Sequence, residues 1–216
     1  MLLQGLIGHG GYGEIYYAID VRSQEEVAVK VEPKKRKGRT VKRMILEQKV
    51  LLRLQGRPHV PKMIASGHDS KINFIVMQLL SVNVGDLKKA SPVRRLGRST
   101  VGRILQQAIA GLRDIHVGGY IHRDVKPANM CFGISPQFRG TVRYVSIRVH
   151  DRIDQGPADD LQSGDPQTSF LALTNESFQE FARAVFSLNT EEEPNYAALQ
   201  ALLTSLPLRI PTALPG

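Results

Sequence analysis

The spacing of apolar residues near the N-terminus predicts β-strands. Ile15–Ile19 is rich in isoleucine and tyrosine, and Glu26–Glu32 alternates between charged and apolar residues, as a half-buried strand does. Pro33 ends the second run because proline has no N–H to donate to a neighbouring strand. Asn73–Leu80 is a third strand-like run. The first third of the chain is therefore predicted to be rich in β-structure.

Helical spacing, with apolar residues three and four positions apart, is present in Thr40–Gln55, Thr100–His116, Ser177–Leu188 and Asn195–Leu206. Ser99 or Thr100 can cap the second of these segments, and Gly118 stops it. Pro157–Gln167 instead concentrates Gly, Pro, Asp, Gln and Ser, which predicts a loop. Because strands come first and helices follow, we expect an α+β protein with segregated lobes and a hinge near Leu79–Val84.

The composition is that of a globular protein with an ordinary core. Of the 216 residues, 42% are hydrophobic and 23% are charged, and no tract of about 18 apolar residues could span a membrane. The opening Met1–Ile7 lacks a basic leader and a cleavage site, so no signal peptide is expected. The single cysteine, Cys131, excludes an internal disulfide and a cysteine zinc cluster, and it favours a reducing compartment. We therefore expect an intracellular protein, located in the cytoplasm, the nucleus or both.

The net charge is strongly positive, with 29 Lys and Arg against 20 Asp and Glu. Such a surface favours anionic partners: phosphates, acidic peptides, nucleic acid or lipid headgroups. The basic run Lys34–Arg43 has no aromatic residue to stack on bases, so we interpret it as a solvated loop and expect no specific nucleic-acid partner. A basic nucleic-acid-binding protein, supported by charge alone, is the weakest functional hypothesis.

A glycine-rich stretch, G-H-G-G-Y-G, contains Gly8, Gly10 and Gly13 between two strand-like segments. Glycines in such a place allow backbone amides to approach a phosphate chain, although the motif alone suits a hairpin turn equally well. A strand at Glu14–Asp20 follows, whereas a dinucleotide-binding fold would place a helix there. Lys30, which ends V-A-V-K on the next strand, could reach phosphates beneath the glycines; the alternative is a solvated lysine.

Glu47 lies on the first predicted helix among apolar neighbours. A buried carboxylate needs a partner, because an unpaired charge is costly to bury. Lys30 is the natural candidate. The alternative is a surface glutamate beside Lys42 or Arg43 on the same helix, where a pair contributes only tenths of a kcal/mol.

The segment that points most strongly to chemistry reads I-H-R-D-V-K-P-A-N and spans Ile121–Asn129. Asp124 could accept a proton from a substrate hydroxyl, and Lys126 could neutralise charge on a transferring phosphoryl group. Asn129 could bind a metal ion through its amide oxygen. The full string, downstream of the glycines and of V-A-V-K, indicates phosphoryl transfer.

With these motifs the chain resembles a eukaryotic protein kinase of the casein kinase one superfamily, and within it the tau-tubulin kinase branch. The matching strings are I-G-H-G-G-Y-G-E-I-Y-Y-A, V-A-V-K-V-E, H-V-P-K-M-I, I-V-M-Q-L-L, I-H-R-D-V-K-P-A-N, F-R-G-T-V-R-Y-V-S and P-A-D-D-L. The resemblance covers nearly the whole chain. It implies one kinase domain over residues 1–216, with a small β-rich N-lobe over 1–80 and an incomplete, mostly helical C-lobe over 81–216.

The resemblance also implies ATP and Mg²⁺ as cofactors. The residues expected to cover ATP are Ile7, Gly8, Gly10, Gly11, Gly13 and Ile15. Lys30 would hold the α- and β-phosphates, braced by Glu47. Ala28, Met77, Gln78 and Leu80 would surround adenine.

For the reaction itself, Asp124 would be the base, Lys126 the cation beside the phosphoryl group and Asn129 a magnesium ligand. Arg143 would help to bind an anion near the substrate. The family often favours acidic or phosphorylated protein substrates, and the net charge of +9 suits that preference.

The chain departs from the family pattern in two places. No D-F-G follows the catalytic segment: Phe132-Gly133 is preceded by Cys131 and comes too soon after Asn129. After Ser163 the long central helix of the large lobe is also missing. We therefore expect ATP-site architecture with impaired turnover. The alternative is an inactive pseudokinase, or an incomplete splice form or gene model, acting as an ATP- or protein-binding module.

Three minor expectations complete the interpretation. Asp160 is expected to match the aspartate that anchors the catalytic loop in this family. His59, His68 and His116 lack neighbours that would make a metal site and are interpreted as ordinary polar residues. Cys131 is expected to be a buried strand residue rather than a nucleophile.

Overall fold

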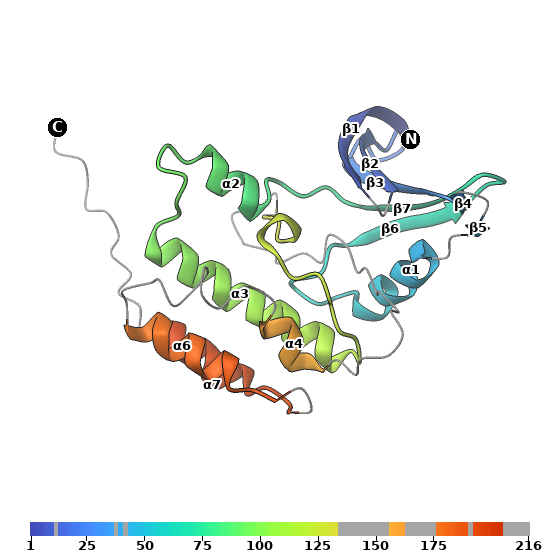
Figure 1. Cartoon of the computed structure of the whole chain (residues 1–216). Coiled ribbons are helices and arrows are strands. Elements are labelled where there is room, and N and C mark those ends of the chain that lie inside the picture. The colour runs from blue at the N-terminus through green and yellow to red at the C-terminus, as the bar shows by residue number, and fades with distance from the viewer. Residues whose placement is uncertain are drawn as a thin grey trace, which may run out of the picture.

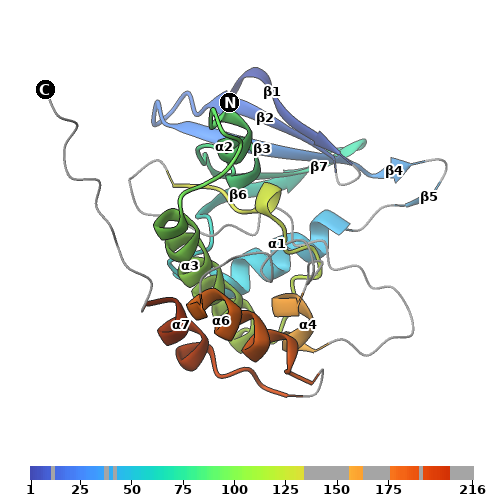
Figure 2. The same ribbon diagram turned by 60° about the vertical axis from the view of Figure 1, so that its left-hand side comes forward.

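The structure is a computed structural model, and it describes residues 1–10, 13–36, 39–40, 43–133, 156–162, 176–189 and 192–204. A five-stranded antiparallel sheet comes first, and a helical region follows it in the chain (Figure 1). The two views in Figures 1 and 2 both place the sheet at one end of the molecule and α3, α6 and α7 at the other. The predicted α+β fold with segregated lobes is confirmed.

The sheet has the order β1-β2-β3-β7-β6. Its strands are β1 (Leu2–Gly10), β2 (Gly13–Ile19), β3 (Glu26–Pro33), β6 (Met63–His68) and β7 (Ile72–Gln78). β3 lies at the centre and is buried on both faces from Val27 to Lys30. Gly13 closes the β1–β2 hairpin with φ of 114°, and a Cβ there would overlap the carbonyl oxygen of Val31. Only glycine fits this turn without strain.

The first helix, α1 (Arg43–Leu54), packs beneath the sheet against β6 and β7. It starts later than predicted because β5 (Arg39–Thr40) precedes it and pairs with β4 (Lys35–Arg36). The prediction of a loop throughout the basic run is therefore wrong. A strand of two residues is too short to show the alternation of apolar and polar residues by which a strand is predicted.

The helical region comprises α2 (Val84–Ala90), α3 (Arg98–Val117), the 3₁₀ turn η1 (Pro127–Asn129), α4 (Pro157–Gln162), α6 (Glu176–Phe186) and α7 (Tyr196–Thr204). α3 begins one residue before Ser99, with Gly97 at its N-cap and no side-chain cap, so the predicted cap is wrong. Gly118 is its C-cap, as predicted. No helix in the described part of the chain is both long and apolar enough to cross a bilayer.

The predicted loop at Pro157–Gln167 is wrong for its first six residues, which form α4. Proline suits the first turn of a helix, where its missing N–H would have no partner in any case. Asp159 and Asp160 lie in the same turn, where the helix dipole favours negative charge. The turn-like composition is thus that of a helix N-terminus. Residues 163–167 lie outside the described part of the chain.

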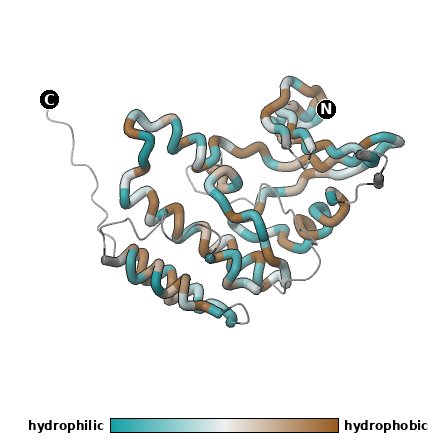
Figure 3. The backbone as a smooth tube through the Cα atoms, in the orientation of Figure 1, coloured by the Kyte–Doolittle hydropathy of each residue, from teal (hydrophilic) through white to brown (hydrophobic). Residues whose placement is uncertain are grey.

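One apolar core connects the sheet to the helices. It contains Ile15, Ala28 and Met77 from the sheet and Ile115 from α3, and Val125 of the catalytic segment packs against it. A second core joins α3 to α6 and α7 through Ile109, Phe178, Phe181, Val185, Tyr196, Leu199 and Leu203. Figure 3 shows the hydrophobic residues that recur along α1 and α3. The first core fixes the catalytic segment relative to the sheet.

Candidate active site

A buried ion pair joins the sheet to α1. Nζ of Lys30 lies 2.7 Å from Oε1 and 2.5 Å from Oε2 of Glu47, and the side chains are 1% and 7% exposed. Burial raises the pKa of the Glu47 carboxyl, and the adjacent Lys30 ammonium opposes that shift. The pairing expected from the sequence is thus formed, and the alternative of an exposed Glu47 is wrong.

The register of the sheet explains why Lys30 points toward α1. Lys30 pairs with Ile15 on β2 and with Ile75 on β7, and Ala28 pairs with Met77. Residues two apart on a strand, and directly paired residues on neighbouring strands, share a face. The ammonium group therefore projects from the same face as Ala28 and Met77, two of the residues expected to surround adenine.

α1 is fixed in place from the same strand. The N–H of Met44, in the first turn of α1, donates to the carboxylate of Glu32 on β3 at 2.9 Å. Because the first N–H groups of a helix have no partner within it, this bond stabilises the helix end. Glu47 lies one turn further along and is held over Lys30.

Strands β1 and β2 form a hairpin that carries the glycine-rich stretch, the glycine hairpin, and its second strand pairs with β3. Gly8 pairs with Ile15 and Gly10 pairs with Gly13. Ile15 is buried, whereas Ile7 is 43% exposed. Gly11 lies outside the described residues. Apart from Gly11, the expected nucleotide-covering residues thus lie on one hairpin, whose second strand pairs with the strand of Lys30.

The segment after β7 joins the sheet to the catalytic segment. Ser81 N–H donates to the carbonyl of Phe132 at 2.8 Å, and Phe132 N–H donates to that of Val82 at 3.1 Å. Cys131 forms a bridge with Asn83 and is fully buried, as expected of a strand residue. The predicted hinge is therefore held by backbone hydrogen bonds to the residues that follow the catalytic loop.

The three predicted catalytic-loop residues lie together. Nζ of Lys126 is 2.8 and 2.9 Å from the carboxylate oxygens of Asp124. Nδ2 of Asn129 donates to the backbone carbonyl of Asp124 at 2.7 Å and to Oδ2 at 2.9 Å. Asn129 is buried, while Asp124 and Lys126 are 25% and 50% exposed. The buried Asn129 thus holds the Asp124 carboxylate in place, while part of that carboxylate remains exposed to solvent.

Asp160 of α4 anchors this loop, as the resemblance implied. Its carboxylate accepts the N–H groups of His122 at 2.5 Å and of Arg123 at 2.7 Å. Arg123 has φ of 61°, a conformation that a non-glycine residue keeps only when its surroundings impose it. Nδ1 of His122 accepts the N–H of Asp124 at 3.1 Å, and burial lowers the pKa of this histidine. The loop is therefore built on buried hydrogen bonds.

The two halves of the site offer complementary chemistry. The sheet supplies a fixed cation, Lys30, and the loop supplies a carboxylate, a second cation and an amide. Val125, next to Asp124, packs on the core that contains Ala28 and Met77, so the halves share one scaffold. Cations placed to neutralise phosphates, with a carboxylate to receive a hydroxyl proton, are the requirements for phosphoryl transfer.

These residues offer few protein oxygens to a metal ion. In the parts of the chain that the structure describes, no three His, Cys, Asp or Glu side chains form a group that could hold a metal. Because Nδ2 of Asn129 donates to Asp124, its Oδ1 is the end left for a ligand. Mg²⁺ often takes only one or two protein oxygens besides phosphate and water. Asn129 could therefore be one ligand of a Mg²⁺ ion that a triphosphate also binds.

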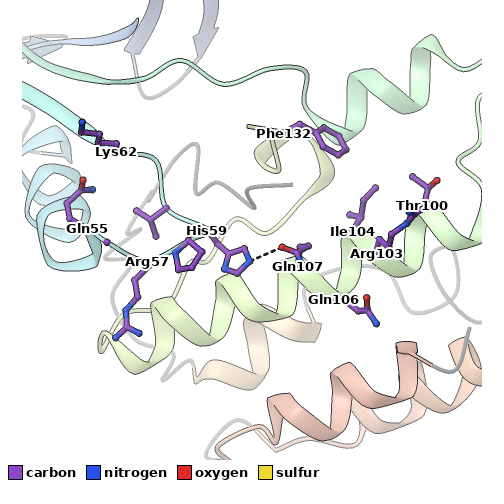
Figure 4. Close-up of a pocket in the computed structure, with 13 residues that line it drawn as sticks. Gln55, Arg57, His59, Lys62, Thr100, Arg103, Ile104, Gln106, Gln107 and Phe132 are labelled. Carbon is purple, nitrogen blue, oxygen red and sulfur yellow. Dashed lines mark hydrogen bonds between the residues drawn. The ribbon is translucent and has the colours of Figure 1, made fainter. Parts of the chain in front are cut away.

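The structure also contains a cavity of about 790 Å³ away from these residues (Figure 4). It lies between the loop after α1 and α3, and its lining includes Arg57, His59, Lys62 and Gln107 but none of the predicted site residues. Nε2 of His59 lies 3.0 Å from Oε1 of Gln107, and Nδ1 lies 3.3 Å from Asp114. His59 is therefore an ordinary hydrogen-bonded polar residue, as interpreted from the sequence.

Two residues near the loop were missed in the sequence. Nε2 of His116 lies 2.8 Å from Asp160, and its Nδ1 lies 2.6 Å from the hydroxyl of Tyr196. Their separation of eighty positions leaves no spacing signal that could have linked them. Arg143, the predicted anion-binding residue, lies outside the described part of the chain.

Comparisons with known proteins agree with this geometry. A family model described as the protein kinase domain matches residues 2–170. The chain is 47% identical over 192 residues to a Caenorhabditis elegans protein named for casein kinase I, covering 74% of this chain and 56% of that protein. It is 29% identical over 257 residues to a Dictyostelium discoideum protein named as a serine/threonine-protein kinase, covering 91% and 51% respectively.

Among solved structures, vaccinia related kinase 3 has the same fold, with a TM-score of 0.75 at 18% identity, covering 94% of this chain and 86% of that one. The chain spans about half the length of the curated relatives it matches. The Dictyostelium alignment is longer than the 216 residues of this chain, so that relative has residues opposite gaps here. On its motifs, its fold and these matches, the chain belongs to the protein kinase family.

Proposed function

We propose that the chain is an ATP-binding serine/threonine protein kinase domain that transfers the γ-phosphoryl group to protein substrates. The observation that carries this proposal is the pairing of two arrangements on one core. The buried Lys30–Glu47 pair fixes a cation on the sheet, and the Asp124–Lys126–Asn129 group lies on the loop beside that core.

The nucleotide would lie between the glycine hairpin and the catalytic loop. Its phosphates would contact Lys30, and its base would lie against Ala28, Met77, Gln78 and Leu80. The residues proposed to cover it are Ile7, Gly8, Gly10, Gly11, Gly13 and Ile15. The shared face of Ala28, Lys30 and Met77 supports this placement.

In the proposed reaction, the Asp124 carboxylate accepts the proton of a serine or threonine hydroxyl. The hydroxyl oxygen forms a bond to the γ-phosphorus while the bond to the β,γ-bridging oxygen breaks, which leaves ADP. Lys126, 50% exposed at the surface of the site, neutralises charge on the transferring group. When bound, Mg²⁺ would supply further charge neutralisation on the phosphates, with Asn129 as a ligand.

The proposed substrates are acidic or phosphorylated protein segments. The net charge of +9 and the 47% identity to a protein named for casein kinase I support this preference. Arg143 is the proposed anion-binding residue. Placement in the tau-tubulin kinase branch rests on the sequence motifs alone.

A second candidate is a pseudokinase that binds nucleotide or protein without turnover. One observation favours it: no Asp or Glu occurs between Asp124 and Asp151, where the family carries the D-F-G aspartate. Removing one preorganised electrostatic element from an active site commonly lowers the rate by about 10²–10³.

The test combines nucleotide binding with phosphoryl transfer. ATP with Mg²⁺ should raise the melting temperature of the chain as mass action requires, whether or not turnover occurs. Transfer of radiolabelled phosphate to casein is then compared between the wild type and Asp124→Asn. Transfer lost in the variant supports the kinase, and binding without transfer in either protein supports the pseudokinase. No stabilisation by ATP would contradict the kinase and a nucleotide-binding pseudokinase, and it would leave only a pseudokinase that binds protein.

A further inference from the structure

A chain of hydrogen bonds reaches the catalytic loop from outside the residues that the family model matches. Tyr196 is the first residue of α7, whereas that match ends at residue 170. Its hydroxyl lies 2.6 Å from Nδ1 of His116 on α3, and Nε2 of His116 lies 2.8 Å from Oδ2 of Asp160 on α4. The same carboxylate accepts the N–H groups of His122 and Arg123. Three helices therefore meet at one imidazole.

The side chains that form these hydrogen bonds are buried. The side chains of His116 and Asp160 are 3% and 1% exposed, and Tyr196 is buried in the core between α3, α6 and α7. Buried polar atoms depend on their protein partners because water cannot replace them. The two rings are tilted by 50°, with centroids 5.8 Å apart, so the hydroxyl meets the imidazole at its nitrogen rather than at its face.

The direction of each hydrogen bond between Tyr196, His116 and Asp160 follows from which atoms can accept. A carboxylate accepts, so Nε2 of His116 donates to Asp160, and in a neutral imidazole Nδ1 is then an acceptor for the hydroxyl of Tyr196. Burial, with the nearby charges of Glu193 and Asp160, raises the pKa of Tyr196 to about 12. The hydroxyl therefore keeps its proton at neutral pH and can donate a hydrogen bond to Nδ1 of His116.

The catalytic loop needs this carboxylate in one orientation. Arg123 has φ of 61°, and its N–H is held by Oδ1 of Asp160. Asp160 lies on a helix of only six residues, whose last residue, Gln162, donates through Nε2 to the carbonyls of Val185 and Leu188 at the end of α6. Gln162 thus ties α4 to the end of α6, and Asp160 reaches α7 only through His116 of α3. The helices α6 and α7 lie beside α3 and α4 in Figures 1 and 2.

We propose that Tyr196 is a positioning residue of the catalytic loop. Its hydroxyl orients His116, His116 orients the carboxylate of Asp160, and this carboxylate fixes the amides of His122 and Arg123. These amides directly precede Asp124, so the C-terminal helix pair is part of the catalytic unit. The effect on catalysis rests on the proposed function, whereas the effect on the loop does not.

The test replaces one hydroxyl at a time in the full chain. Tyr196→Phe removes the bond to His116. Tyr17→Phe is the matched control, because its hydroxyl also makes a 2.6 Å bond, to Glu26 on the surface of the sheet. Amide hydrogen exchange is followed by mass spectrometry across residues 117–130. Tyr196→Phe should speed exchange at His122 and Arg123 roughly tenfold, and Tyr17→Phe should leave it unchanged.

A purely structural role for Tyr196 gives a different pattern. Exchange would then quicken in α7 and its packing partners, while His122 and Arg123 stayed protected, and this result would overturn the proposal. If the wild type transfers phosphate, Tyr196→Phe should lower kcat and leave the KM for ATP unchanged. If it does not, the kinase proposal fails, but the exchange experiment still decides the role of Tyr196.

A measurement on the wild type covers the case in which Tyr196→Phe does not fold. Nitrogen-15 chemical shifts report which nitrogen of His116 carries a proton. A proton on Nε2, facing Asp160, is the expected result. An Nε2 without a proton could not donate to the carboxylate and would overturn the proposal.

Discussion

The two ion pairs of the site differ in burial far more than in length. Lys30 and Glu47 are 2.5 Å apart with side chains 1% and 7% exposed, whereas Lys126 and Asp124 are 2.8 Å apart with side chains 50% and 25% exposed. Attraction between charges is strong where water is excluded and weak where it is not. The first pair is therefore a fixed part of the core, and the second can exchange its partner for a substrate.

The loop pair nevertheless holds a defined position because its support is buried. Asp160 binds the backbone N–H groups of His122 and Arg123, and Asn129 binds the carbonyl of Asp124. The side chains of Asp124 and Lys126 are thus partly exposed to solvent, while buried hydrogen bonds hold the backbone that carries them. In the sheet half of the site the charged groups themselves are buried. In the loop half only the supporting backbone is buried, and the charged groups are exposed to solvent.

Breaking the buried pair should have the largest effect on stability. Lys30→Met leaves the Glu47 carboxylate without its cation and should lower the free energy of unfolding by about 3–5 kcal/mol. Urea unfolding measures the loss. The double variant Lys30→Met/Glu47→Leu removes both charges and should recover most of it. A loss below about 1 kcal/mol for the single variant would show that the pair behaves as a surface pair.

The turn of the glycine hairpin should be the next most sensitive position. Gly13→Ala places a Cβ against the carbonyl oxygen of Val31 at a φ of 114°, so it should destabilise the domain by about 1–3 kcal/mol. Gly5→Ala on the same hairpin is the control, because its Cβ would meet nothing within 4 Å. Equal melting temperatures for the two variants would contradict a rigid sheet half.

The support of the loop should weaken in acid. Burial lowers the pKa of His122 below its usual 6.5, so the unfolded chain binds a proton more readily than the folded one. The stability that His122 contributes is present above pH 6.5 and is lost as pH falls below it, by at most about 1.4 kcal/mol per pH unit.

Urea unfolding between pH 7.5 and 5.5 measures this slope. His122→Asn keeps an acceptor near the N–H of Asp124 but does not titrate in this range, so its slope should be shallower. Identical slopes in the two proteins would exclude His122 as the source.

Removing the exposed cation should have the smallest effect. Lys126→Ala should change the free energy of unfolding by less than about 1 kcal/mol, because solvent screens this pair. The measurement is made beside Lys30→Met under the same conditions. Comparable losses in the two variants would remove the distinction between the two pairs.

The fold could be predicted where the pattern was strong and local. The alternation in Glu26–Glu32 and the spacing in Thr100–His116 correspond to β3 and α3. β6 was missed because M-I-A-S-G-H is short and mixed, with Gly67 packed against the ring of Phe74 on the neighbouring strand. Such a strand owes its conformation to its partner, which its own sequence does not reveal.

The site residues also include some that a local pattern predicted and others that no pattern predicted. Asp124, Lys126 and Asn129 lie within six positions, so their spacing indicated a common role. The Lys30–Glu47 pair was predicted because a buried carboxylate needs a cation. His116 and Tyr196 came together only through helix packing, and each alone is an ordinary residue of an apolar helix face.

Chemical labelling by a nucleotide probe tests the central claim most directly. An acyl-phosphate derivative of ATP transfers its acyl group to lysines next to the bound phosphates, and mass spectrometry identifies them. The account predicts labelling of Lys30 and Lys126 that excess ATP prevents. Labelling spread over surface lysines such as Lys34, Lys62 and Lys88, with no protection by ATP, would contradict a nucleotide held between the glycine hairpin and the catalytic loop.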